Sequence, residues 1–146
     1  MSLYYFDASA LVKLYVAEAH GERVRQTAAR ADQIACSLIA YIETRAAFAR
    51  RHRVKELSVA EFERAKRDFD RDWQVFSALS IDTELARQAA DFAERFALRS
   101  YDAIHLASAD RLRRETGNEM SFACFDKALN GAAESIGMRL FLGSMP

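Results

Sequence analysis

The sequence predicts one α/β domain in which a mostly parallel sheet is covered by helices on both faces. Short, bounded apolar runs, several of them rich in aromatic or β-branched residues, alternate with longer stretches of helical periodicity, as in βα units. The chain has 146 residues, of which 51% are hydrophobic. Its single proline is the last residue, so long uninterrupted helices are possible anywhere. Five runs are expected to form strands, at 3–6, 34–36, 78–81, 121–125 and 138–142.

A helix is predicted over residues 58–76. Ser58 followed by Glu61 is a capping-box pattern at its start. Its large apolar side chains fall on one face, and we interpret them as core or as an apolar partner surface, not as a base-stacking platform. These side chains are Phe62, Phe69, Trp73 and Phe76.

Further helices are predicted in the second half of the chain. One follows Asp82, one begins near Ser100 as a plausible N-cap, and one ends where Gly137 would follow its C-terminus. The helix after Asp82 has an apolar stripe made of Leu85, Ala89, Phe92 and Phe96. Two helices separate the second and third strands, so the alternation is not strict. With no repeat or linker in the sequence, we expect a single domain over 1–146.

Composition narrows the functional classes. The 21 basic and 21 acidic residues give a formal net charge of zero, which does not favour a nucleic-acid binder by total charge. No apolar run approaches the roughly 18 residues that span a membrane, and no secretory signal is visible. Cys36 and Cys124 lie in short apolar runs, which is typical of buried, reduced thiols. We therefore expect a cytoplasmic protein with no membrane partner.

Four acidic residues occupy matching places on this predicted fold. Asp7 and Asp126 lie just past the ends of strands, Glu43 lies in the second turn of a helix, and Asp102 lies in the first turn of another. Residues beyond the carboxyl ends of parallel strands line the ligand crevice of such sheets. Each acid also has an ordinary explanation, since Asp7 and Asp126 could cap helices, Asp102 could complement a helix dipole, and Glu43 could be surface.

Carboxylates that converge at a buried edge repel one another and need a cation or basic partners. Oxygen ligands without a histidine and cysteine cluster indicate Mg²⁺ or Mn²⁺, not zinc. Such ions activate water and stabilise charge during phosphodiester hydrolysis.

Four segments in order, "YYFDASALVKLY", "SLIAYIETRAAFAR", "SYDAIHLASA" and "FACFDKAL", resemble the PIN domain, in particular VapC-type toxins of prokaryotic toxin–antitoxin pairs. The resemblance extends over nearly the whole chain. It implies a three-layer α/β/α sandwich with strand order 3-2-1-4-5, in which Cys36 and Cys124 lie on the strands that flank the central one and are not paired.

The resemblance also implies a function. We expect an endoribonuclease that depends on Mg²⁺ or Mn²⁺ and acts as the toxin of a type II pair, with RNA as substrate, a cognate antitoxin as partner, and a homodimer. Ser9 would support the site by hydrogen bonding. The catalytic and metal-binding acids would be Asp7, Glu43, Asp102 and Asp126, none of which is replaced.

Other residues have more than one reading. His105, one turn after Asp102, could be a general base, but we favour a packed, hydrogen-bonded supporting residue. Asn130 could touch the water shell of a metal. From Arg45 to Lys55 inclusive there are five arginine or lysine residues and no acid. This stretch is either a solvated helix face or a phosphate-binding patch. Helical spacing places Arg50 on the Glu43 side. We expect RNA to contact Arg50 and Arg51, although an antitoxin or a second protomer could bind the same patch.

Rival classes are distinguished by single positions. A haloacid-dehalogenase-like phosphatase would need a second aspartate where Ser9 stands, and a receiver domain would need an acidic pair near the first strand, where Asp7 is alone. A PIN-fold module that binds RNA or protein without catalysis remains the alternative. Metal-stimulated RNA cleavage that is lost in Asp7→Asn would exclude it.

Overall fold

The computed structural model describes residues 2–117 and 119–141. Within them the chain forms one five-stranded sheet with the order β3-β2-β1-β4-β5, and every neighbouring pair is parallel. This confirms the predicted fold class and strand order. The strands are β1 Leu3–Phe6, β2 Gln33–Ser37, β3 Ser77–Leu79, β4 Met120–Ala123 and β5 Arg139–Leu140. They agree with the predicted runs to within about two residues at their ends, and position 142 of the last run lies outside the described residues.

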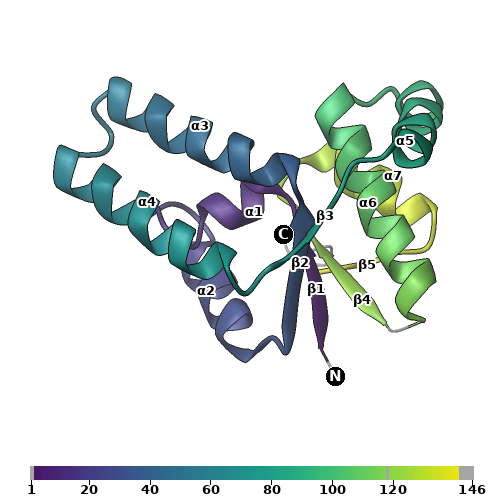
Figure 1. The fold of residues 1–146 in the computed structure, drawn as a ribbon, viewed down its shortest axis with the longest axis horizontal. Helices are drawn as coiled ribbons and strands as arrows, with labels where there is room; N and C mark the ends of the chain where they lie inside the picture. The colour runs from purple at the N-terminus through teal and green to yellow at the C-terminus, as the bar shows by residue number, and fades with distance from the viewer. Residues whose placement is uncertain (1, 118, 142–146) are drawn as a thin grey trace.

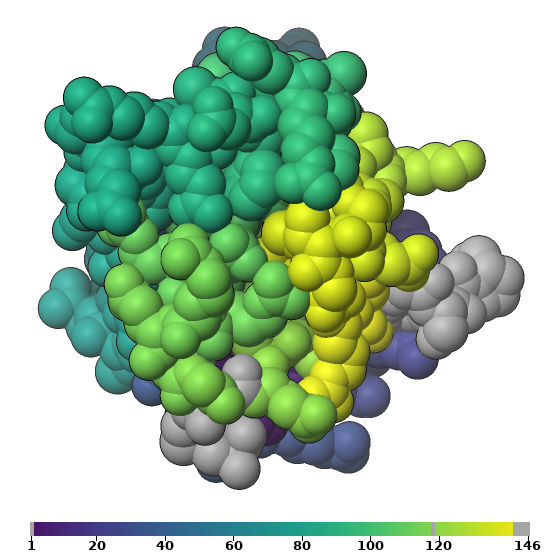
Figure 2. Space-filling view, turned by 90° about the vertical axis from the view of Figure 1, so that its right-hand side faces the viewer, coloured from purple at the N-terminus to yellow at the C-terminus, as the bar shows by residue number. Residues whose placement is uncertain are grey.

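Helices cover both faces of the sheet (Figure 1). The first four lie on one side and the last three on the other. They are α1 Ala8–Val12, α2 Gly21–Arg30, α3 Ile39–Arg53, α4 Val59–Trp73, α5 Thr83–Phe96, α6 Ser100–Thr116 and α7 Lys127–Ser135. Figure 2 views the second side, where α5, α6 and α7 lie next to one another over the sheet.

Alternate strand residues pack into the two layers, because successive side chains of a strand point to opposite faces. Tyr5 and Phe122 are fully buried against α5–α7, and their rings stack at 5.7 Å. Phe6 and Cys36 belong to a second cluster with α1 and α2. Both faces are therefore apolar, as parallel sheets require.

The helices α3 and α4 form a long antiparallel pair beside α1 (Figure 1). A third apolar cluster joins them, centred on Phe48 and Phe69 with Val12 of α1. Trp73 packs edge-on against Phe69 at 5.6 Å, which confirms that the aromatic face of the 58–76 stretch is core. This packing fixes α3, and with it Glu43, relative to the sheet.

Local end signals decide the helix boundaries. Ser58 and Glu61 form the predicted capping box, although the helix ends at Trp73 because the chain turns into β3 at Ser77. The prediction of Ser100 as N-cap is wrong. Arg99 has the extended backbone of the N-cap position and makes no side-chain capping hydrogen bond, and the helix begins at Ser100. The Arg99 guanidinium forms an ion pair with the Asp102 carboxylate instead.

Two further expectations are met. Gly137 follows the C-cap of α7 with a φ of 90°, a backbone conformation that glycine adopts without strain. Cys36 on β2 and Cys124 just after β4 are buried and unpaired, on either side of β1. No helix in the described part of the chain is long and apolar enough to cross a membrane.

Candidate active site

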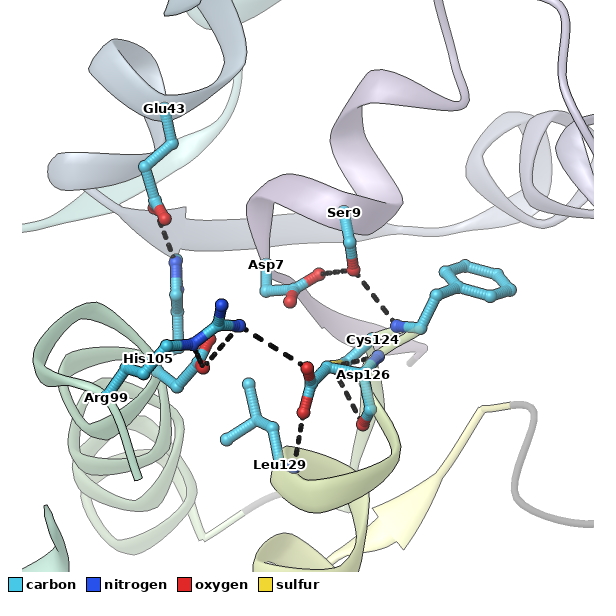
Figure 3. Close-up of polar contacts among 10 residues, drawn as sticks. Asp7, Ser9, Glu43, Arg99, His105, Cys124, Asp126 and Leu129 are labelled. Carbon is cyan, nitrogen blue, oxygen red and sulfur yellow. Dashed lines mark hydrogen bonds and ion pairs between the residues drawn. The ribbon is translucent and has the colours of Figure 1, made fainter. Parts of the chain in front are cut away.

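The four predicted acids come from different parts of the chain and gather around His105 and Arg99. Figure 3 labels three of them, Asp7, Glu43 and Asp126. Asp7 follows β1 directly, and Asp126 follows β4 by three residues. Asp102 lies in the first turn of α6, and Glu43 lies in the second turn of α3. Two basic side chains, Arg99 and His105, lie among them.

Asp7 is held in place from two directions. It is the N-cap of α1, and its Oδ1 accepts hydrogen bonds from the Ala10 amide at 3.0 Å and from Ser9 Oγ at 2.6 Å. Ser9 Oγ also accepts from the Phe125 amide at 3.0 Å, so one hydroxyl ties the end of β1 to the turn after β4. Asp7 is only 4% exposed, and this burial raises the pKa of its carboxyl. The capping explanation and the site explanation of Asp7 are therefore compatible.

Asp102 and Asp126 share one cation. Arg99 Nε lies 3.0 Å from Asp102 Oδ2, and Arg99 Nη2 lies 3.5 Å from Asp126 Oδ2. Asp126 Oδ1 accepts the Leu129 amide at 2.8 Å as the N-cap of α7. Its own amide contacts Cys124 Sγ at 3.2 Å. Sequence reasoning did not single out Arg99, although its place three residues before Asp102 is a helical ion-pair spacing.

Glu43 is joined to a buried histidine. His105 Nε2 lies 2.7 Å from Glu43 Oε1, and its Nδ1 lies 2.8 Å from the Tyr5 hydroxyl. Burial by itself lowers the pKa of His105, but the hydrogen bond to Glu43 and the nearby acidic charges outweigh it and leave the pKa above 6.5. His105 is thus the packed, hydrogen-bonded residue that the sequence favoured, and it also orients a site acid.

Asn130 supports the turn that positions Asp126. Its side-chain amide donates to the Cys124 carbonyl at 2.8 Å, which links α7 to the end of β4. Contact between Asn130 and the water shell of a metal stays a prediction.

The donor set suits a hard divalent cation, since it consists of carboxylate oxygens. Among residues 2–117 and 119–141, however, no three acidic, histidine or cysteine side chains stand where they would hold an ion together. A guanidinium lies between two of the carboxylates, and a histidine holds a third. The position of Arg99 indicates that this place accepts positive charge, so the residues fit such an ion by chemistry and charge.

A cavity of about 690 Å³ adjoins Glu43. Basic and aromatic side chains from α1, α3, the start of α6 and the turn after β4 line it. They include Lys13, Arg50, Arg51, Arg53, Tyr101 and Phe125. As helical spacing predicted, Arg50 shares this cavity with Glu43. Arg51 instead pairs with Glu18, which also contacts Lys13.

Comparisons with known proteins agree with this fold. The family profile of the PIN domain matches residues 4–133. Ribonuclease VapC45 and Ribonuclease VapC49, from two strains of Mycobacterium tuberculosis, are each 34% identical over 140 residues, covering 96% of this chain and 95% of the relative.

Solved structures share the fold at lower identity. VapC20 of Mycobacterium tuberculosis superposes with a TM-score of 0.66 at 19% identity, covering 88% of this chain and 94% of the other. A toxin–antitoxin complex from Klebsiella pneumoniae has a TM-score of 0.63 at 20% identity, covering 90% of this chain and 92% of the other. FitAcB from Neisseria gonorrhoeae has a TM-score of 0.66 at 16% identity, covering 94% of this chain and 96% of the other. The profile match and the near full-length relatives establish that the chain belongs to the PIN-domain family and is of the VapC type.

Proposed function

We propose that this protein is a Mg²⁺- or Mn²⁺-dependent endoribonuclease that acts as the toxin of a type II toxin–antitoxin pair. The observation that carries the proposal is the convergence of four acids from separate elements. Ion pairs with Arg99 and His105 offset part of their negative charge. The ribonuclease names of relatives that are 34% identical over almost the whole chain support the activity. The toxin–antitoxin complex of the same fold supports an antitoxin partner.

In this proposal Asp7, Glu43, Asp102 and Asp126 hold the ion. When bound, the ion would activate a water and stabilise charge on the phosphoryl oxygens. The chain's own contribution is positioning. The α1 cap and Ser9 hold Asp7, the α7 cap holds Asp126, and His105 holds Glu43. Groups held in this way lose little entropy when an ion and a phosphate bind, because their rotamers are already fixed.

The adjoining cavity is where an RNA strand would approach the acids. Arg50 is exposed on its rim, and its guanidinium has no ion-pair or hydrogen-bond partner among the described residues, so its charge is available to a phosphate. A homodimer and a cytoplasmic location are further parts of the proposal, and the resemblance to VapC toxins is their basis. Sedimentation of the purified protein would test the dimer.

The deciding experiment is cleavage of single-stranded RNA by the purified protein with Mg²⁺, with Mn²⁺ and with excess EDTA, beside Asp7→Asn. We expect cleavage only with metal, no cleavage by the variant, and products with 5′-phosphate and 3′-hydroxyl ends. Full activity in EDTA would rule out the metal mechanism. RNA binding without cleavage in any metal would favour a binding module.

A further inference from the structure

Arg99 is a cation that the acidic site already contains, and the proposed function gives it no role once a metal ion is bound. Its guanidinium lies 3.0 Å from Asp102 and 3.5 Å from Asp126, two acids that are 24 positions apart in the chain. It is the only arginine or lysine within ion-pair distance of two of the four site acids among the described residues. Arg99 therefore occupies a place between carboxylates that a divalent ion would need.

The geometry allows Arg99 to leave this place without opening the core. Its side chain is 63% exposed, whereas that of Asp102 is 10% exposed. Its backbone forms the N-cap of α6, and its guanidinium lies 5.0 Å from the centre of the Tyr101 ring. Tyr101 lines the adjoining cavity, so a displaced guanidinium can keep this aromatic contact while it moves away from the acids.

Charge argues that the two cations exclude each other. Without Arg99, the Asp102 and Asp126 carboxylates would face each other with no cation between them. A divalent ion on the same two carboxylates would lie beside a fixed guanidinium, and like charges at contact distance repel. The contacts with the acids raise the pKa of Arg99 further, so Arg99 stays charged and its repulsion of a bound metal ion is not removed by deprotonation.

We propose that Arg99 is a tethered counter-ion that competes with the divalent ion for Asp102 and Asp126. It stabilises the acidic cluster when metal is absent and weakens metal binding when metal is present. This inference rests on the proposed metal-dependent function.

The test measures Mn²⁺ binding to the purified protein without RNA, by calorimetry and by electron paramagnetic resonance of free Mn²⁺. Arg99→Gln should lower the Kd for Mn²⁺ roughly three- to tenfold, since it removes one competing ion pair with each acid. It should also lower Tm in the absence of metal and increase the rise in Tm on adding Mn²⁺. Arg87→Gln, which removes an exposed charge from α5, is the matched control and should leave the Kd for Mn²⁺, the metal-free Tm and the rise in Tm unchanged.

Arg99→Lys separates contact from net charge, because lysine keeps the charge but cannot bridge two carboxylates with a planar fork. Its Kd should lie between those of the wild type and Arg99→Gln. If Arg99→Lys equals the wild type while Arg99→Gln binds more tightly, the effect is one of net charge and the competition is refuted. Equal or weaker Mn²⁺ binding by Arg99→Gln refutes it as well. If neither the wild type nor the variants bind Mn²⁺, both the proposed metal site and this inference are refuted. If all of them bind Mn²⁺ equally, only the inference about Arg99 is refuted and the metal site is supported.

Discussion

Nε2 of His105 lies 2.7 Å from Oε1 of Glu43, although the two residues are 62 positions apart. The contact joins α3, on one side of the sheet, to α6 on the other (Figure 1). The ring is 1% exposed, and its other nitrogen contacts the Tyr5 hydroxyl at the centre of the sheet. The Glu43 carboxylate is thus held by a group that has little freedom to move.

Replacing His105 should therefore disable Glu43. In His105→Asn the side chain is too short to reach the carboxylate, and we expect Mn²⁺ affinity and RNA cleavage to fall roughly 10- to 100-fold, the usual effect of losing a group that orients a ligand. His105→Gln, whose amide extends about as far as Nε2, should recover part of the loss. The measurements are Mn²⁺ calorimetry and single-turnover cleavage.

Tyr5→Phe is the matched control for this prediction. It removes only the hydroxyl on the far side of the ring and leaves the Glu43 contact in place. We expect a much smaller effect on metal affinity. Equal losses in Tyr5→Phe and His105→Asn would mean that the histidine acts through core packing alone.

The ionisation of Asp7 should destabilise the metal-free protein at neutral pH. Burial raises its pKa in the folded state, and the charge of His105 offsets this only in part. As pH rises above 3.8, the unfolded chain loses this proton first, while the folded protein retains it up to the higher pKa. The unfolded state then binds fewer protons, so the free energy of unfolding falls with rising pH across this window.

Asp7→Asn removes this ionisation and keeps an N-cap acceptor. Urea unfolding in EDTA should show the variant to be as stable as the wild type near pH 3 and more stable at pH 7, with no RNA cleavage. A loss of roughly 3 kcal/mol in the free energy of unfolding at pH 7, the size expected when a buried charge pair is broken, would show that Asp7 is structural.

His105 should add a second pH dependence above pH 6.5. Its pKa is raised in the folded state, so the free energy of unfolding should fall further as pH rises through that range. This decline should occur in the wild type and in Asp7→Asn but not in His105→Asn.

The fold was predictable because its signals are local. The "YYF" run before Asp7, the capping box at Ser58 and the glycine at 137 each specify a nearby piece of backbone. Parallel strands then bring their carboxyl ends to one edge, which is why acids after β1 and β4 could be placed together. The strand order itself came from the resemblance to PIN domains, since periodicity does not determine which strands are neighbours.

The cations of the site were harder to predict, because they depend on tertiary contacts. The spacing of Arg99 and Asp102 is visible in the sequence. However, the sequence does not indicate which of its 21 lysine and arginine residues lies in the site. Its second partner, Asp126, lies 27 positions away. Serine is a common N-cap residue, so the sequence favours Ser100 as the cap. In the structure Arg99 holds the N-cap position and makes no side-chain capping hydrogen bond.

Asp126 should show separable structural and chemical roles. Its Oδ1 caps α7, and its Oδ2 faces Arg99. Asp126→Asn keeps an acceptor for the Leu129 amide, whereas Asp126→Ala loses it at a cost of about 1 kcal/mol. Both variants should lose most cleavage activity, and only the alanine variant should unfold at lower urea. If the asparagine variant retains full activity, Asp126 is a cap and not a metal ligand.

Arg50 and Arg51 are adjacent in sequence but have different surroundings. Arg50 is exposed at the rim of the cavity that Glu43 lines, and its guanidinium has no partner among the described residues. Arg51 is half-buried, bonded to Glu18 and 3.7 Å from Glu56. The prediction that RNA contacts both arginines therefore becomes two separate predictions, and the neighbouring positions provide matched charge reversals.

Arg50→Glu should weaken RNA binding across sequences, because a phosphate contact positions the strand without reading its bases. It should also flatten the salt dependence of binding by roughly 0.7 log units per lost contact on a single strand. Cleavage at saturating RNA should persist.

Arg51→Glu should instead place a second acid against Glu18 and lower the stability of the α1–α3 junction, with a smaller change in the salt dependence of RNA binding. Fluorescence anisotropy at several salt concentrations, in an Asp7→Asn background that prevents cleavage, together with thermal melts, measures both effects. If Arg50→Glu leaves RNA affinity and its salt slope unchanged but disrupts a dimer or an antitoxin complex, then the rim of this cavity is a protein-binding surface.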